Sequence, residues 1–192
     1  AFAEDERVLT VSIHQEDLWP KTGAIDDIAG GMARNLPMPG GMHDDEMRFI
    51  LFEYLIPLGL SVAPQAIVLQ CGCDTLAEDP LSRQLLGNQS IWEVVGAMTR
   101  LAPRSLVLGG GGYSPYGVAR CWSGVWATIN GIEIPDVLPI TAENILRVIK
   151  WAHSRGRQPA SELFTTLADP WRGGAIRDEV RDRVKRLRGY GV

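Results

Sequence analysis

The sequence predicts an α/β fold with three layers: a mostly parallel sheet and helices on both of its faces. Two observations support this prediction. Continuous apolar runs of strand length alternate with longer segments of helical periodicity, and unbroken apolar strands are typical of sheets that are buried on both faces. The chain has 192 residues, 45% of them hydrophobic, which suffices for one domain with a buried core.

Three strands are expected. Residues 7–13 are rich in β-branched side chains, and residues 66–70 and 105–108 are continuous apolar runs. Residues 15–42 between the first two strands are rich in Gly, Pro, Asp and Asn. We expect them to form a long loop, and loops of that length usually have a function or are mobile.

Four segments carry apolar residues at helical spacing: residues 44–60, 90–101, 115–130 and 142–153. Asp44 and Asp45 suit the N-terminus of the first, where a cap and the helix dipole favour acidic side chains. Ser90 and Glu93 are predicted to form a capping box at the start of the second.

The charge is unevenly distributed. The net charge of −4 argues against a generally basic nucleic-acid binder, and no apolar run is long enough to span a membrane. Residues 172–188 nevertheless hold seven Lys or Arg against three acidic residues. This segment is expected to be a helix that keeps its charges in water. It would dock through one apolar stripe, formed by Ile176, Val180, Val184 and Leu187.

The chain shows no signal peptide, since its N-terminus lacks a basic region followed by an apolar one. It also lacks a starting Met, which hints that it begins inside a longer gene product. The cysteines Cys71, Cys73 and Cys121 fit no structural zinc spacing. We therefore expect a reduced, cytoplasmic chain.

Ligands of parallel sheets bind at the carboxyl ends of the strands, which directs attention to the loops there. Asp74 follows the strand at 66–70, either as a cleft carboxylate or as a cap or turn residue. Asp79 precedes Pro80, a dipeptide that is first a turn signal. His14 and His43 have no partner at metal-ligand spacing, and structural or surface roles are expected for both.

Four glycines, residues 109–112, follow the strand at 105–108. They admit three interpretations: a phosphate or anion site at backbone N–H groups, a tight strand-to-helix turn, or room for a ligand beside Tyr113. The motif matches neither common nucleotide-binding pattern, so the first interpretation has weak support. The phenol of Tyr113 could donate a hydrogen bond to an oxyanion, or Tyr113 could be a packed aromatic residue.

The segments VLQCGCDTLAEDPLS and LVLGGGGYSPYGVARCW, with VLTVSIHQ upstream and IPDVLP downstream, resemble the histone deacetylase superfamily of arginase-like zinc hydrolases. The closing TLADPWRGGAIRDEVRDRV resembles the bacterial branch of acetoin-utilisation proteins. The resemblance implies that residues 1–192 are the C-terminal part of one deacetylase-like domain. Residues 140–192 would be its helical C-terminal extension, and the N-terminal half of the domain would be absent.

The resemblance also implies roles for individual residues. Asp74 matches a zinc ligand of the family, and Tyr113 matches the tyrosine that polarises the acetyl carbonyl and stabilises the oxyanion. An acyl tunnel would be lined by Trp19, Leu81 and Gly112. Two potassium sites, mainly of backbone ligands, would use Ser12 and Ile13 for the inner ion, and Phe2, Asp5 and Val8 for the outer one. Zinc is the expected catalytic metal, and one carboxylate does not exclude iron.

The chain departs from the family pattern in one respect. The D-x-H motif that carries two more zinc ligands is absent, and so is the His–His pair that supplies the general base. The expected function is therefore part of a zinc-dependent deacetylase, catalytically incomplete as this chain. Its substrate would be acetylated lysine or a similar small acyl amide. The alternatives are a non-catalytic half-domain scaffold, and one half of a split enzyme that a partner chain or self-association completes.

Overall fold

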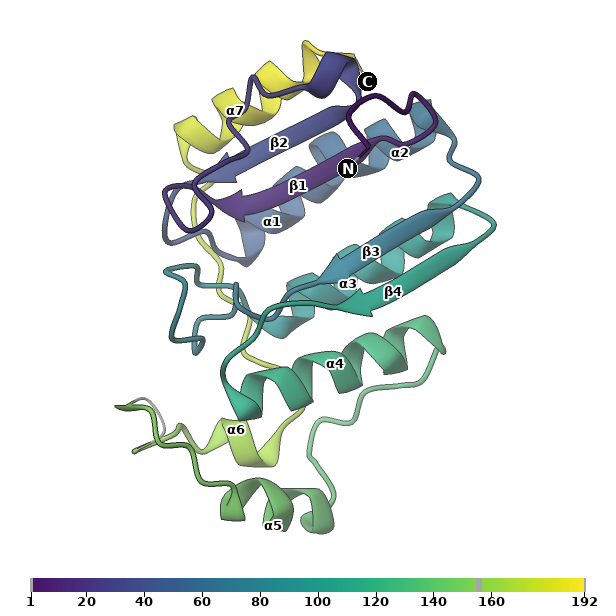
Figure 1. The fold of residues 1–192 in the computed structure, drawn as a ribbon. Helices are drawn as coiled ribbons and strands as arrows, with labels where there is room; N and C mark the ends of the chain where they lie inside the picture. The colour runs from purple at the N-terminus through teal and green to yellow at the C-terminus, as the bar shows by residue number, and fades with distance from the viewer. Residues whose placement is uncertain (1, 155–156, 192) are drawn as a thin grey trace.

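Four parallel strands form the framework of the computed structural model, which describes residues 2–154 and 157–191. β1 (Thr10–Gln15) pairs with β2 (Ala33–Met38), and β3 (Ile67–Cys71) pairs with β4 (Ser105–Gly109). Figure 1 shows the two pairs side by side, with β1 next to β3 and all four arrows pointing the same way. The predicted α/β class with parallel strands is confirmed.

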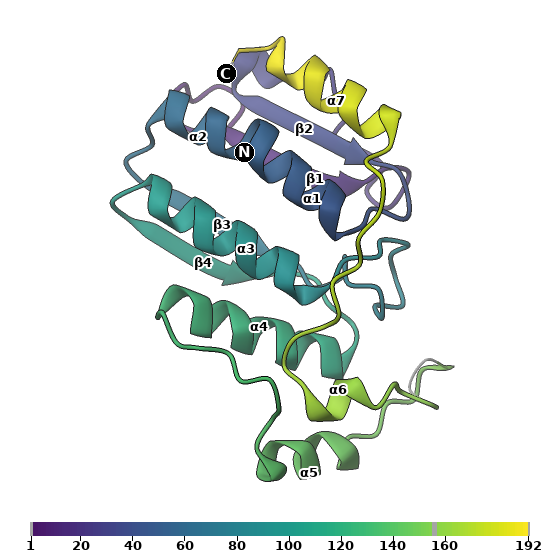
Figure 2. The same cartoon turned by 180° about the vertical axis from the view of Figure 1, so that it is seen from behind.

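Helices α1, α2, α3 and α7 lie on one side of these strands, which faces the viewer in Figure 2. α4 lies beside β4 and packs against α3, and α5 and α6 lie beyond it. The α-helices of the described residues are α1 (Asp44–Ile50), α2 (Ile56–Val62), α3 (Asn88–Met98), α4 (Pro115–Ile129), α5 (Ile140–Val148), α6 (Glu162–Thr165) and α7 (Asp178–Arg188). Short 3-10 turns occur at Ala29–Gly31 and Thr99–Leu101. No helix of the described residues is long and apolar enough to cross a membrane.

The expected helix at 44–60 exists and continues to Val62. A π-helical turn, Leu51–Leu55, joins α1 to α2 without a break. It directly precedes Pro57, which has no N–H for the usual bond to the residue four positions earlier, so the helix departs from α geometry where proline interrupts its hydrogen bonds. Ala63 ends the helix in the left-handed conformation.

Two apolar clusters make up the core. The first joins β2, α1, α2 and α7, and the second joins the end of β3 to α3 and α4. The predicted stripe of the basic helix is confirmed for Val180, Val184 and Leu187, which lie on α7 and are buried in the first cluster. α7 begins only at Asp178, so Ile176 lies before the helix, although it packs against the same cluster. Full burial of one such side chain contributes about 1.5–3 kcal/mol.

The expectation of a loop over residues 15–42 is wrong, because β2 lies inside this segment. Arg34, Asn35 and Pro37 interrupt its apolar pattern, so that only Leu36 and Met38 mark the buried face. β2 pairs with β1 alone among the described residues, and proline is tolerated in such an edge strand. β1 also begins three residues later than the expected strand, at Thr10.

The predicted capping box at Ser90 is also wrong. α3 begins at Asn88 after Gly87, the Ser90 hydroxyl donates to the Gly87 carbonyl, and Glu93 pairs with Arg48 of α1. The helix expected at 142–153 is shorter than predicted: α5 spans Ile140–Val148, because Ile149 adopts an extended conformation.

Candidate active site at the carboxyl ends of the strands

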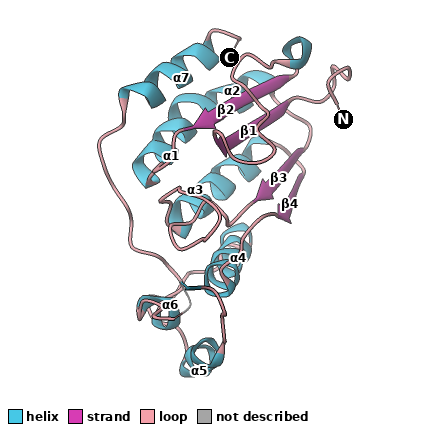
Figure 3. Ribbon diagram, turned by 60° about the vertical axis from the view of Figure 1, so that its left-hand side comes forward, coloured by secondary structure: helices cyan, strands magenta, loops and turns pink. Residues whose placement is uncertain are grey.

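The loops that follow β1, β3 and β4 carry the candidate site residues. Since the strands are parallel, these loops leave the same edge of the framework (Figure 3). Gln15 at the end of β1 connects two of them, because its side-chain oxygen accepts a hydrogen bond from the Arg83 N–H at 2.8 Å.

Asp74 lies in the loop after β3, and glycines surround its carboxylate. A Cβ atom added to Gly111 would lie 2.2 Å from Oδ2, and one added to Gly72 would lie 2.7 Å from Oδ1. The two loops are joined where the Cys73 N–H donates to the Gly111 carbonyl at 2.6 Å. The glycines after β4 therefore allow the two loops to approach closely, a role that the three interpretations from the sequence did not include.

The surroundings of Asp74 disfavour its negative charge. Burial raises the pKa of this carboxyl, a hydrogen bond from its own backbone N–H opposes the rise, and the nearby Asp79 carboxylate adds to it. A bound cation would offset the energetic cost of burying the Asp74 charge and the repulsion of this charge by Asp79. Asp74 is therefore suited to be a metal ligand.

Tyr113 is placed by the start of α4. The Ser114 hydroxyl accepts a hydrogen bond from the Gly117 N–H, and Pro115 occupies the first turn of the helix. The Tyr113 N–H donates to the buried carboxylate of Asp79 at 2.7 Å. Tyr113 itself is 51% exposed.

Asp79 has a larger role than the sequence indicated. The predicted turn is present, since the Leu81 N–H donates to its Oδ1 at 2.9 Å. Its Oδ2 also holds the backbone of Tyr113, 34 residues further along the chain. The only local signal for this role was the Asp-Pro dipeptide.

The three expected tunnel residues lie in these loops. Trp19 follows β1 and is 91% exposed, and Leu81 follows β3 and is also exposed. Gly112 has a φ of +146°, and a Cβ atom there would meet Val118 and Cys73. The structure places the three residues at one edge of the framework, and their assignment to a tunnel remains a prediction.

The expected potassium ligands lie at and before β1. The Ser12 hydroxyl and Nδ1 of His14 are 2.9 Å apart, and burial lowers the pKa of His14. The backbone carbonyls of Phe2 and Asp5 accept hydrogen bonds from the N–H groups of Asp5 and Val8. A carbonyl has two lone pairs and can also bind an ion, so these assignments, including Ile13, remain predictions.

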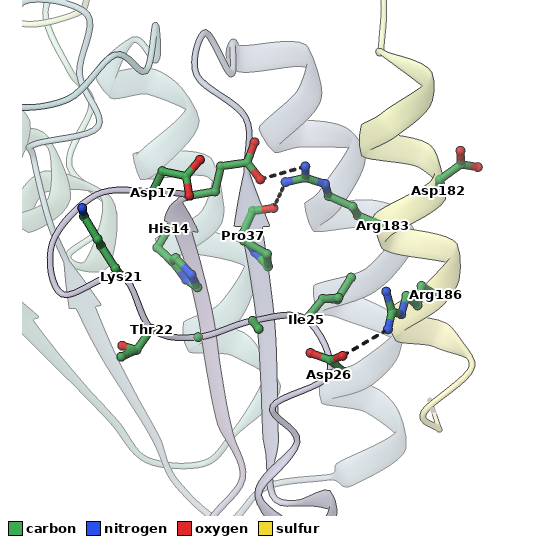
Figure 4. Close-up of a pocket in the computed structure, with 13 residues that line it drawn as sticks. His14, Asp17, Lys21, Thr22, Ile25, Asp26, Pro37, Asp182, Arg183 and Arg186 are labelled. Carbon is green, nitrogen blue, oxygen red and sulfur yellow. Dashed lines mark hydrogen bonds and ion pairs between the residues drawn. The ribbon is translucent and has the colours of Figure 1, made fainter.

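A pocket of about 520 Å³ lies between the loop after β1 and α7 (Figure 4). Many of its charged side chains pair with one another. Arg183 pairs with Glu16 at 2.9 Å and also donates to the Pro37 carbonyl, and Arg186 lies 3.7 Å from Asp26. These contacts join α7 to β2 and to the segment between β1 and β2.

The described residues fit one position of a zinc site rather than a complete one. A catalytic zinc needs about three protein ligands, and no group of three His, Cys, Asp or Glu among residues 2–154 and 157–191 could hold a metal ion. His43, for example, contacts the Ala175 carbonyl at 3.2 Å and lies 3.9 Å from Glu46. The expected role of Asp74 as a zinc ligand therefore remains a prediction.

The model of the histone deacetylase domain matches residues 1–129. The chain belongs to the histone deacetylase family. This deacetylase-family chain is 38% identical to histone deacetylase 19 of Arabidopsis thaliana over 145 residues, 72% of this chain and 29% of that protein. It is 35% identical to histone deacetylase 8 of Xenopus laevis over 146 residues, 71% of this chain and 45% of that protein. It thus spans less than half the length of these curated relatives.

Solved structures confirm the arginase/deacetylase-like fold of this family member. The crystal structure of an HDAC homologue from Aquifex aeolicus superposes with a TM-score of 0.89 at 32% identity. A structure of an HDAC homologue complexed with SAHA gives the same values. In both, the superposition covers 97% of this chain and 52% of the other.

Proposed function

We propose that this chain is the C-terminal part of a zinc-dependent deacetylase domain that hydrolyses acetylated lysine or a similar small acetylated amine. The observation that carries the proposal is the joining of the two loops. The Cys73–Gly111 hydrogen bond and the hydrogen bond from Tyr113 to Asp79 join these loops. The loops carry Asp74, whose carboxyl has a raised pKa, and the exposed Tyr113 at one edge of the framework. The family membership and the resemblance of residues 166–184 to acetoin-utilisation proteins support a bacterial branch.

In this proposal each residue has one task. Asp74 offers one ligand to zinc, and the ion when bound would supply Lewis acidity toward the acetyl carbonyl and the attacking water. The phenol of Tyr113 donates a hydrogen bond to the oxygen that becomes negative when water adds to the acetyl carbon. Further ligands and the general base come from polypeptide outside these 192 residues. The products are acetate and a free amine.

A fusion protein tests the proposal. The 192 residues are joined to the part of the A. aeolicus HDAC homologue that they do not match. We expect this fusion to retain about one zinc ion and to deacetylate an acetyl-lysine peptide or acetylated polyamine. The unfused chain should retain none after removal of excess zinc.

Two substitutions in the fusion separate the roles. Asp74→Ala should remove both zinc and turnover, whereas Tyr113→Phe should keep zinc and lower turnover about 10²–10³-fold, the loss typical of an oxyanion donor. Asp26→Ala and Tyr190→Phe are matched controls and should change neither. Zinc retained in Asp74→Ala, or parental turnover in Tyr113→Phe, would refute the assignment. A folded fusion without zinc would favour the scaffold alternative.

A further inference from the structure

Exposed cations surround the candidate site, although the chain as a whole has a net charge of −4. Lys21 lies in the loop after β1, Arg83 in the loop after β3, and Lys150 directly after α5, and all three are exposed. None of the three has an ion-pair partner within residues 2–154 and 157–191. We call these three residues the basic rim.

Two members of the basic rim lie on loops that the structure joins. The Arg83 N–H donates to the side-chain oxygen of Gln15 at 2.8 Å, and Gln15 ends β1, from which the loop with Lys21 begins. Figure 4 shows the Lys21 side chain extending away from α7, so it is not drawn into the ion pairs between that helix and the loop. Lys21 follows the exposed Trp19 by two residues, and Arg83 follows the exposed Leu81 by two. Both cations therefore adjoin expected tunnel residues.

The third member, Lys150, is placed by the first turn of α4. The Tyr116 hydroxyl donates to the Ile149 carbonyl at 3.1 Å, and the rings of Tyr116 and Trp151 meet edge-on with centroids 6.2 Å apart. Tyr116 is buried and follows Tyr113 by three residues. Figures 1 and 2 show the segment after α5 at the end of α4 that carries Tyr113. Since α4 lies beside β4, the basic rim has members on both sides of the loop after β4.

The acidic side chains of the same loops are mostly engaged within the fold. Glu16 pairs with an arginine of α7 at 2.9 Å, Asp79 accepts hydrogen bonds from two backbone N–H groups, and Oε1 of Glu78 is buried. Asp74 is the expected ligand of a metal cation. Asp17 is exposed and opposes one of the three cations. The charge that these segments present to solvent is therefore positive.

A positive rim discriminates between the substrates that the proposed function leaves open. Charges of one sign around a site raise the local concentration of ligands of the opposite sign. An acetylated polyamine keeps protonated amines near neutral pH, so the basic rim would repel it. A ligand that meets cations on both sides of Tyr113 must extend in two directions, as a peptide does on either side of an acetylated lysine.

We propose that Lys21, Arg83 and Lys150 select acetyl-lysine peptides in which acidic residues flank the modified lysine on both sides. The chemistry of this substrate rests on the proposed deacetylase function, whereas binding of acidic peptides by the basic rim can be measured without turnover. The three residues determine specificity and take no part in the reaction itself.

Binding is measured on the unfused 192-residue chain, which carries the whole basic rim, by fluorescence anisotropy of labelled peptides. Three peptides of equal length contain one central acetyl-lysine, flanked on both sides by Glu, by Ser or by Lys. At about 20 mM ionic strength we expect the Glu peptide to bind at least about tenfold more tightly than the Lys peptide. The difference should shrink in about 0.5 M salt, because the cations are exposed and their charges are screened.

Charge reversal shows whether the basic rim is responsible. Lys21→Glu, Arg83→Glu and Lys150→Glu should each lower the preference for the Glu peptide at least about twofold. Lys185→Glu is the matched control, because it makes the same change in net charge at an exposed lysine of α7 that does not line the pocket beside the loop after β1. All four variants are checked for parental thermal melting.

Three outcomes would overturn the proposal. The first is equal affinity for the Glu and Lys peptides, and the second is an equal effect of Lys185→Glu and the rim variants. The third is tighter binding of a single-stranded oligonucleotide that has the net charge of the Glu peptide, since the rim would then be a general anion site.

The fusion with the unmatched part of the A. aeolicus HDAC homologue separates selectivity from chemistry. With the fusion, kcat/KM should fall from the Glu peptide to the Ser peptide to the Lys peptide, mainly through KM, and Lys21→Glu should reduce this order while Lys185→Glu preserves it. An active fusion whose selectivity is indifferent to Lys21→Glu supports the deacetylase assignment and refutes the basic rim. Rim-dependent binding of the Glu peptide by a chain whose fusion is inactive supports the basic rim and counts against the deacetylase assignment.

Discussion

The buried carboxylate of Asp79 accepts a hydrogen bond from the backbone N–H of Tyr113 at 2.7 Å, and its other oxygen accepts one from the Leu81 N–H at 2.9 Å. One side chain thereby fixes the loop after β3 to the loop after β4. In the proposed deacetylase, Asp79 would position the oxyanion donor and a tunnel residue without touching the substrate.

Replacement of Asp79 by alanine should therefore destabilise the chain. Asp79→Ala leaves the N–H groups of Tyr113 and Leu81 without acceptors, and we expect the free energy of unfolding to fall by about 1–3 kcal/mol in urea denaturation. Asp26→Ala, at a carboxylate that is 69% exposed, should stay within about 0.5 kcal/mol of the parent. Equal stability of the two variants would contradict this role of Asp79.

A second measurement separates positioning from simple folding. In the fusion protein, Asp79→Ala should lower turnover while the zinc content stays at the parental level, because Asp74 keeps its glycine surroundings. Parallel loss of zinc and turnover would indicate that Asp79 only supports the fold.

Gly111 should not tolerate a side chain. A methyl group at this position would meet Oδ2 of Asp74 at 2.2 Å, so the carboxylate or the loop must move. Gly111→Ala is expected to cost about 1–3 kcal/mol in stability, as overpacked sites do, and to lower zinc retention by the fusion. Gly40→Ala is the matched control, because its Cβ would lie 3.5 Å from the nearest atom, an ordinary contact. Parental zinc retention in Gly111→Ala would show that the close fit around Asp74 is dispensable.

The sequence predicted the elements whose signals are local. β3, β4 and α4 lie within about two residues of their expected bounds, because continuous apolar runs and helical spacing of apolar residues are properties of the segments themselves. β2 was missed because its ladder depends on pairing with β1, which overrides Pro37 and Arg34. The capping box at Ser90 failed for a similar reason, since Arg48 of another helix pairs with Glu93.

The candidate site was predictable only in part. Asp74 and Tyr113 were identified by position at strand ends and by family resemblance. The role of Asp79 was not predictable, because it depends on a hydrogen bond between residues 34 positions apart.

The charge of Asp74 should make stability depend on pH. Burial raises its pKa in the folded chain above the ordinary value of 3.8, so folding favours the protonated carboxyl. The protonated carboxyl makes its full contribution to the stability of the fold below pH 3.8, and this contribution is lost as the pH rises through the pKa of the folded chain. The ionised carboxylate therefore lowers the stability of the fold near neutral pH. With a chelator present, Asp74→Asn should therefore be more stable than the parent at about pH 7 in urea denaturation.

Acid gives the internal control for this prediction. At about pH 3.5 most Asp74 carboxyls are protonated in both folded and unfolded chains, and the advantage of Asp74→Asn should shrink. Asp26→Asn, at an exposed carboxylate, should show no such pH-dependent difference. An Asn variant that is less stable than the parent near neutral pH would show that the ionised carboxylate has favourable partners there.

The segment that follows α6 is fastened to α4 by a buried ion pair. Arg120 of α4 contacts Asp169 at 2.6 Å, and its guanidinium also donates to the carbonyls of Thr166 and Ala168. Both charged side chains are almost fully buried. Removing one partner would leave the other charge buried and unpaired, so Arg120→Met should lower the free energy of unfolding by about 3–5 kcal/mol.

Two further variants show whether burial is the cause. Arg120→Lys keeps the charge but lacks the planar fork, and its loss of stability should be intermediate. Arg147→Met removes a pair with Glu143 that has a similar distance, 2.7 Å, but is partly exposed, and it should cost about 0–1 kcal/mol. Urea denaturation of the three variants provides the comparison. If Arg120→Met and Arg147→Met lowered the free energy of unfolding by similar amounts, solvent would reach both ion pairs alike. That result would contradict the burial of Arg120 in the structure.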